Sequence, residues 1–100
     1  MGKPHRNLEA EREKPSRQAL EETVARLVAS TLGKKSGSIQ PDAPLFSSQA
    51  GFDSFSLMEL VLRLEDTLGF KIPDEDLDPD VFLSIKTITS YLHNRLERRA

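Results

Sequence analysis

The chain has 100 residues, of which 37% are hydrophobic, and this allows one domain with a single modest core but no cleft between domains. It has no cysteine, which excludes disulfide bonds and thiolate metal sites. The net charge of -2 conceals a strongly acidic region, because positions 42–80 hold ten acids and two bases, and such a region disfavours nucleic acid and anionic membranes.

Residues 1–15 combine charged side chains with two prolines and almost no apolar side chains, so they cannot bury enough surface to offset the entropy of ordering. We predict a flexible tail over residues 1–15 and one domain over residues 16–100. No apolar run approaches the roughly 20 residues of a membrane span, and the charged N-terminus lacks the apolar segment of a signal peptide. We therefore expect a cytoplasmic monomer with no membrane association.

The first predicted helix begins after Ser16, a favoured capping residue, and ends at Gly33. Its apolar side chains recur at helical spacing: Leu20, Val24, Leu27, Val28 and Leu32. Between positions 34 and 53 this periodicity is lost, and glycines and prolines interrupt any regular element. We expect a long loop that is pinned across the core by its isolated apolar residues, Ile39, Leu45, Phe46 and Phe52.

The second predicted helix covers residues 54–68, with Asp53 as its cap and Gly69 as its stop. One stripe of apolar side chains is expected to face the core: Leu57, Leu60, Val61, Leu64 and Leu68. A second apolar stripe lies roughly 100 to 160° away and is bordered by acids: Phe55, Met58 and Leu62, with Glu59, Glu65 and Asp66. This second stripe has two interpretations, an exposed docking surface or a further part of the core of a small, crowded domain.

After the second helix, Phe70 and Ile72 are expected to anchor a short linker. An acid-rich stretch follows over residues 74–80, and Pro79 predicts the start of a short third helix. Thr87 is the expected cap of the last helix, whose apolar residues keep helical spacing. No segment alternates apolar and polar residues long enough to predict a sheet. The expected fold is therefore an all-α bundle of four helices with a long first loop and a short third helix.

Ser54 is the residue best placed to carry chemistry, because it stands at the beginning of the second helix. A helix N-terminus offers unpaired N–H groups and a partial positive charge of about half a unit, which stabilise a phosphate attached there. The same position also suits a serine that only caps its own helix. The residues alone leave both interpretations open.

Three sequence elements in register resemble the acyl carrier protein family. Residues 51–60 read GFDSFSLMEL, a Leu-Glu pair follows at 64–65, and residues 70–76 read FKIPDED. In that family a Gly-x-Asp-Ser-Leu signature opens the second helix, a Glu-Leu pair follows one turn later, and Ile-Pro-Asp-Glu lies in the next loop. The likeness extends over residues 17–97 and implies the family's four-helix fold.

The resemblance implies that Ser54 receives 4'-phosphopantetheine from coenzyme A through a Mg2+-dependent phosphopantetheinyl transferase, and that Asp53 faces this transferase. The protein would not be an enzyme. It would hold acyl or aminoacyl groups as thioesters, loaded by a ligase and delivered to synthases or transferases of fatty acid, modified lipid or secondary-metabolite biosynthesis. The second helix is the family's recognition element, which assigns partner docking to its second stripe: Phe55, Met58, Glu59, Leu62, Glu65 and Asp66.

Three departures from the family pattern favour a specialised carrier over one that serves fatty acid synthesis. Phe55 replaces the leucine that usually follows the serine, Arg63 places a positive charge in an acidic helix, and the stretch from 76 to 84 is longer.

Two other functions compete with the carrier. An enzyme would need a base for Ser54, yet the only histidines, His5 and His93, show no partner pattern. The acids at 74–80 lack the glycine and terminal glutamate of a calcium-binding loop, so we expect no metal site. The remaining alternative is a helical adaptor domain that binds basic partners and carries no prosthetic group.

Overall fold

The computed structural model describes residues 16–47 and 51–99, and the predicted tail over residues 1–15 lies outside them. The described part contains three α-helices, one turn of 3-10 helix and no strand. In chain order these elements are α2 (Arg17–Thr31), α3 (Ser54–Leu68), η1 (Asp74–Asp76) and α4 (Ile85–Arg99). The all-helical prediction is confirmed, but the count of four α-helices is not, because only three are found in these residues.

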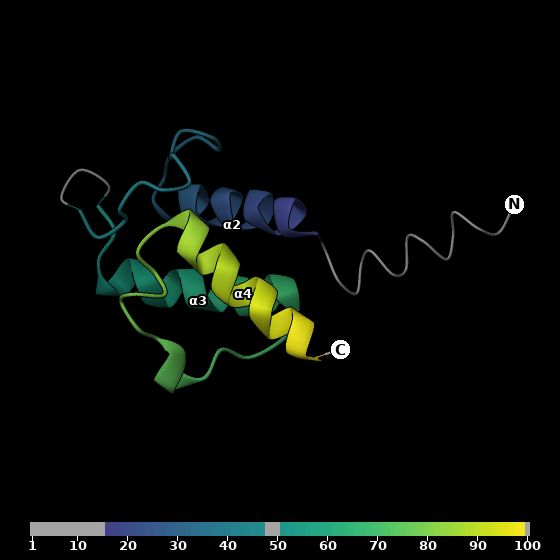
Figure 1. Cartoon of the computed structure of the whole chain (residues 1–100). Helices are drawn as coiled ribbons and strands as arrows, with labels where there is room; N and C mark the ends of the chain where they lie inside the picture. Colours follow the sequence, from purple (N-terminus) through teal and green to yellow (C-terminus); the bar gives the residue numbers. More distant parts are fainter. Residues whose placement is uncertain (1–15, 48–50, 100) are drawn as a thin grey trace, which may run out of the picture.

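Helix α2 packs against both α3 and α4, and it lies along the upper side of the bundle in Figure 1. Helices α2 and α3 run in opposite directions, and α4 crosses in front of them. A long segment leads from the end of α2 to the start of α3, and η1 lies on the segment that joins α3 to α4. This connection places the start of α3 at one end of the molecule, beside the long loop.

Polar caps begin α2 and α3 and a glycine ends α3, as the sequence predicts. The Oγ of Ser16 accepts the N–H of Ala19 at 3.1 Å, which caps α2. Helix α3 ends at Gly69, whose φ of 78° is left-handed and whose N–H donates to the carbonyl of Glu65. Since residues other than glycine rarely adopt this conformation, Gly69 fixes the direction in which the chain leaves α3.

The core is a single cluster that all three α-helices share. Its fully buried side chains come from α2, α3, α4 and the loops: Leu20, Val24, Val28, Leu45, Leu60, Leu64, Phe82, Ile85, Ile88 and Leu92. From the long loop, Leu45 and Phe52 are buried, and the N–H of Leu45 donates to the carbonyl of Leu83 at 2.7 Å. The long loop is therefore pinned to the core, as expected. Phe46 is the exception, because it stays exposed and packs edge-on against Phe52 with ring centroids 5.0 Å apart.

The short third helix predicted from Pro79 does not form, and the one short helical turn lies earlier, at η1. The Oδ1 of Asp78 accepts the N–H of Asp80, and its carbonyl accepts the N–H of Val81. Side chains of this kind satisfy nearby backbone groups in turns and so compete with helix formation. The chain therefore makes a tight turn after Asp78 in place of a helix.

Thr87 is also not the cap of the last helix. The Oγ of Ser84 accepts the N–H of Thr87 at 3.2 Å, and the Oγ1 of Thr87 accepts the N–H of Ser84 at 3.0 Å. This reciprocal pair is a capping box, in which the residue three positions after the cap returns the hydrogen bond. Helix α4 consequently begins at Ile85, three residues earlier than the start at Ile88 that a Thr87 cap would have given.

Candidate functional site

Ser54 is the first residue of α3, and its side chain is exposed. Its hydroxyl makes no hydrogen bond within the described residues. The interpretation of Ser54 as a mere cap is not supported, because Asp53 provides the cap through its Oδ1, which accepts the N–H of Ser56 at 2.9 Å. An exposed, unengaged hydroxyl at the positive end of a helix fits a phosphate ester on Ser54 Oγ.

The Asp53 carboxylate lies along the first turn of α3 and stays charged there. The backbone N–H of Ser56 lowers the pKa of Asp53 below its ordinary value of 3.8. The predicted contact of Asp53 with a transferase stays a prediction. What the geometry adds is that the same carboxylate holds the helix turn on which Ser54 stands.

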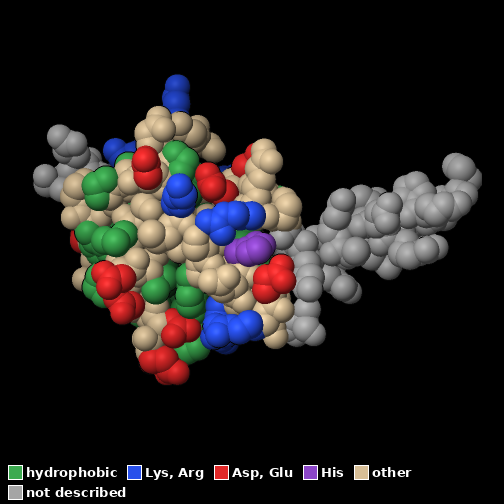
Figure 2. Space-filling model, viewed as in Figure 1, with side chains coloured by type: hydrophobic (Ala, Val, Ile, Leu, Met, Phe, Trp, Pro, Cys, Tyr) green, Lys and Arg blue, Asp and Glu red, His purple; other side chains and the backbone are tan. Residues whose placement is uncertain are grey.

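The second stripe of α3 is exposed. The exposed fractions are 78% for Phe55, 49% for Met58 and 63% for Leu62. The interpretation of this stripe as additional core is therefore wrong. Apolar side chains gather on the left edge of the molecule in Figure 2, over the start of α3, with acidic side chains beside them. Three large apolar side chains that no element covers are a feature of interaction surfaces.

The acids that border the stripe are not equivalent, which the sequence did not reveal. Glu59 forms an ion pair with Arg63 at 3.0 Å, and the Nη1 of Arg63 donates to the Oγ of Ser30 on α2 at 2.9 Å. Glu65 is turned inward, with only 13% of its side chain exposed. Asp66 is exposed and has no ion pair within the described residues. Only Asp66 presents a free carboxylate at this edge.

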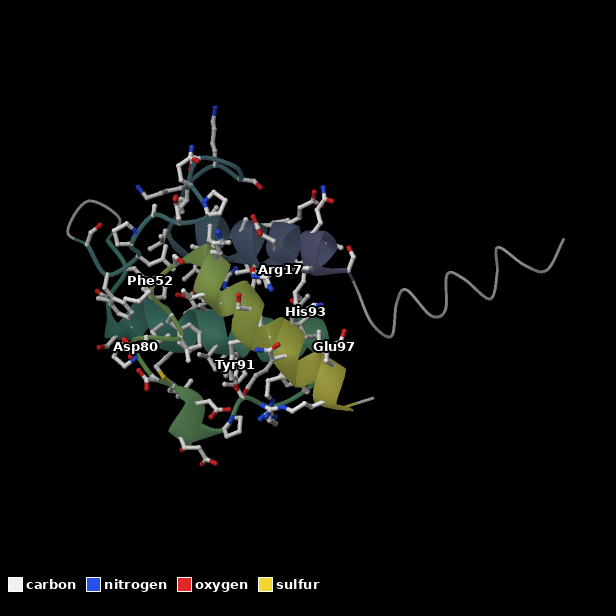
Figure 3. All side chains as sticks on the ribbon, viewed as in Figure 1. Arg17, Phe52, Asp80, Tyr91, His93 and Glu97 are labelled. Atoms are coloured by element: carbon white, nitrogen blue, oxygen red, sulfur yellow. The ribbon has the colours of Figure 1, made fainter. Side chains whose placement is uncertain are left out.

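One acid of the stretch from 74 to 80 is tied to α4. The Oδ2 of Asp76 accepts the hydroxyl of Tyr91 at 2.5 Å and lies 3.4 Å from the Nη1 of Arg95. The guanidinium of Arg95 lies over the ring of Phe70 at 5.8 Å. Figure 3 shows Tyr91 between α4 and the segment that carries η1. Burial, followed by the hydrogen bond to Asp76, raises the pKa of Tyr91 above its ordinary value of 10.0.

His93, the one histidine within the described residues, lies far from Ser54. His93 and Glu97 sit toward the C-terminal end of α4, whereas Phe52, two residues before Ser54, lies at the opposite end of the molecule (Figure 3). The Nε2 of His93 is 3.7 Å from Glu97 on the same helix. His93 is therefore not placed to act as a base for Ser54.

Within residues 16–47 and 51–99, no group of three or more histidine or carboxylate side chains is arranged to hold a metal ion. None of the helices described here combines the length and the apolar character needed to cross a bilayer.

A family model described as a phosphopantetheine attachment site matches residues 22–92. The matched range runs from α2 into α4 and contains Ser54 together with the exposed stripe of α3.

Proposed function

This chain belongs to the family of phosphopantetheine attachment domains, which includes the acyl carrier proteins, and on that premise we propose that its prosthetic group is attached to Ser54. A carrier domain of this family is the site of covalent 4'-phosphopantetheine attachment and is not catalytic. The phosphopantetheine group ends in a thiol, to which acyl groups are bound as thioesters. Because the chain has no cysteine, no thiol of the protein competes with it.

The observation that carries the proposal is the state of Ser54. Its hydroxyl is exposed, is not needed as a cap and lies at the positive end of α3. Asp53 holds the first turn, and Phe55 extends into solvent directly after the serine. These residues present the hydroxyl to an approaching enzyme and leave space for a phosphodiester.

Carrier domains are modified by phosphopantetheinyl transferases and interact with synthases and ligases. We infer that these partners dock on the exposed face of α3 that Phe55, Met58 and Leu62 form. The acids of residues 42–80 would speed their approach by attracting basic surfaces. The three departures from the family pattern favour acyl or aminoacyl cargo of a specialised pathway. Residues 16–100 would act as the carrier domain, in a cytoplasmic monomer.

The test of the attachment site is an intact-mass measurement. We expect the purified protein, incubated with coenzyme A, Mg2+ and a broad-specificity transferase, to gain one phosphopantetheinyl group. Ser54→Ala should gain nothing. Ser56→Ala is the matched control, since it removes a hydroxyl two residues along the same helix and should still be modified.

A mass gain in Ser54→Ala would place the arm on another residue. No gain in the wild type with several active transferases would contradict the carrier and favour the alternative, an unmodified helical adaptor domain that binds basic partners.

A further inference from the structure

The long loop between α2 and α3 forms a groove of about 330 Å³, the loop groove, whose lining residues run from Lys34 to Ser47. Apart from Lys34, the lining combines small apolar and uncharged polar side chains, among them Ser38, Ile39, Gln40, Ala43, Pro44 and Ser47. Its volume is at the lower end of the range for small-molecule sites. None of these residues belongs to α3, so the loop groove is separate from the exposed stripe.

The loop groove is formed in advance, because the loop is fastened to the chain at the start of α4. The N–H of Lys86 donates to the carbonyl of Pro41 at 2.8 Å. The N–H of Leu45 donates to the carbonyl of Leu83 at 2.7 Å, and Ile39 packs against the core. Long loops that are ordered in this way are uncommon in compact domains unless they have a function. A groove that is already rigid loses little freedom when a ligand enters it.

One end of the loop groove lies close to the attachment point. The carbonyl of Ser47 accepts the N–H of Gly51 at 3.1 Å. The three residues from Gly51 to Ser54 span at most about 11 Å, so the Ser47 carbonyl lies within roughly 14 Å of Ser54. The rings of Phe46 and Phe52, 5.0 Å apart, hold the two ends of this stretch side by side. An extended phosphopantetheine arm spans roughly 17 Å at ordinary bond lengths, so it reaches the groove from Ser54.

The chemical groups of the loop groove match those of the arm, which contains two amides, a hydroxyl and a geminal dimethyl group. The side chains of Ser38 and Gln40 make no hydrogen bond within the described residues, and both can donate and accept one. They are suited to the amides of the arm. Ile39, Ala43 and Pro44 provide an apolar surface for the dimethyl group.

The covalent tether makes a weak site sufficient. A group on a short flexible tether is present at an effective concentration in the millimolar range. A site that binds free pantetheine with a Kd of about 1 mM would therefore be occupied at least half of the time once the arm is attached. A free metabolite would need millimolar concentrations to compete, so the arm is the favoured occupant of the groove.

We propose that the loop groove is a resting site for the pantetheine part of the prosthetic arm. The inference rests on the proposed attachment of the arm to Ser54. In the resting position the arm lies along the loop, away from the exposed stripe of α3, and it must leave the groove to enter a partner enzyme. The contacts are hydrogen bonds from Ser38 and Gln40 and apolar contacts with Ile39, Ala43 and Pro44.

The first test is an NMR titration of the unmodified, 15N-labelled full chain with free pantetheine. We expect saturable shifts of the backbone amides of Ile39, Gln40 and Ala43, with a Kd in the millimolar range. Gln40→Ala should weaken binding about three- to tenfold, the range that corresponds to loss of one hydrogen bond. Gln18→Ala is the matched control, because it removes the same amide from a separate groove on α2 and should bind as the wild type does.

The second test uses the modified protein, with an unlabelled arm attached to the 13C-labelled chain. Isotope-filtered NOEs should connect the dimethyl protons of the arm with the methyl groups of Ile39 and Ala43. They should weaken in Gln40→Ala and persist in Gln18→Ala. Gln40 is exposed, so its truncation removes the hydrogen bond without disturbing the core.

An arm on Ser54 that gives no NOE to Ile39 or Ala43 would overturn the resting site, as would equal weakening of pantetheine binding by Gln18→Ala. Because the titration needs no attached arm, the two proposals fail separately. A chain that gains the arm but shows neither the shifts nor the NOEs contradicts only the resting site. A chain that binds free pantetheine in the loop groove but never gains the arm supports the groove and contradicts only the attachment.

Discussion

Asp53 combines a structural role with its predicted contact to the transferase. Its carboxylate caps α3, and the N–H of Ser56 lowers its pKa below 3.8. A lowered pKa means that the charged form stabilises the fold. That contribution is present above the ordinary value of 3.8 and is lost as the pH falls through the lowered pKa. The helix turn that carries Ser54, the serine that we propose to be modified, is thus stabilised by the ionised carboxylate of its neighbour Asp53.

Asp53→Ala should lower the melting temperature at pH 7, and this difference from the wild type should shrink below pH 3.8. Asp53→Asn keeps a capping oxygen without the charge, so it should melt close to the wild type. If the carboxylate also faces the transferase, Asp53→Asn should still be modified more slowly. Melting curves from pH 2 to 7 and initial rates of modification check the two roles. If Asp53→Asn were as unstable as Asp53→Ala, the capping role of Asp53 could not be separated from its predicted contact with the transferase, and this prediction would be wrong.

At the scale of elements, the cluster of Phe70, Asp76, Tyr91 and Arg95 fastens the segment after α3 to α4. This segment has only a single 3-10 turn, so its own backbone contributes little to keep it in place. Side-chain contacts with α4 hold the segment in place instead. The hydrogen bond from Tyr91 to a carboxylate is the shortest of them.

Tyr91→Phe should lower the free energy of unfolding by about 1 kcal/mol, the size of a partly exposed hydrogen bond. Hydrogen exchange should quicken most in residues 70–77, because they lose their tie to α4. The raised pKa of Tyr91 makes this stability present below pH 10.0 and lost as the pH rises further, so the difference between the two proteins should narrow in alkali. Urea denaturation at pH 7 and above pH 10 measures the difference in unfolding free energy between Tyr91→Phe and the wild type. A difference that stays constant with pH would contradict the stabilising role of the Tyr91 hydroxyl.

The sequence predicted those elements whose signals are local. The caps Ser16 and Asp53 and the left-handed stop at Gly69 depend on neighbours within about one turn, whereas the sequence left the second stripe of α3 open between a docking surface and a part of the core. The prediction of a third helix at Pro79 was wrong because the side chain of Asp78 accepts the N–H of Asp80 and stabilises a turn there. A proline favours a helix start only where no neighbouring side chain stabilises a turn in this way.

Contacts between elements were beyond reach of the sequence. Nothing in the spacing of residues indicates that Arg63 reaches Ser30 on another helix, or that Glu65 accepts the N–H of Ile72. A count of acids on one helix face therefore overstates the charge available to partners. Of the three acids assigned to docking, the structure leaves only Asp66 without an internal partner among the described residues.

At the scale of the whole molecule, α3 separates two tasks on opposite faces. Leu64 is fully buried in the core to which α2, α3 and α4 all contribute, whereas Leu62, two residues earlier, is 63% exposed. The same substitution at the two positions removes the same atoms from very different surroundings. This pair therefore distinguishes the contribution of α3 to the fold from its contribution to docking.

Leu64→Ala should lower the free energy of unfolding by about 2–5 kcal/mol, since it leaves a cavity in a core shared by three helices. Leu62→Ala should change it by less than about 0.5 kcal/mol. Under conditions where both variants are folded, the order should reverse for modification. Leu62→Ala should lower the transferase's kcat/KM by about fivefold, as expected when an exposed side chain that a partner buries is lost. Leu64→Ala should be modified like the wild type, because it does not reach the surface. Chemical denaturation measures the unfolding free energies of the two variants, and initial rates measure how fast each is modified. Equal rates for Leu62→Ala and wild type would remove Leu62 from the docking face while leaving Ser54 as the attachment site.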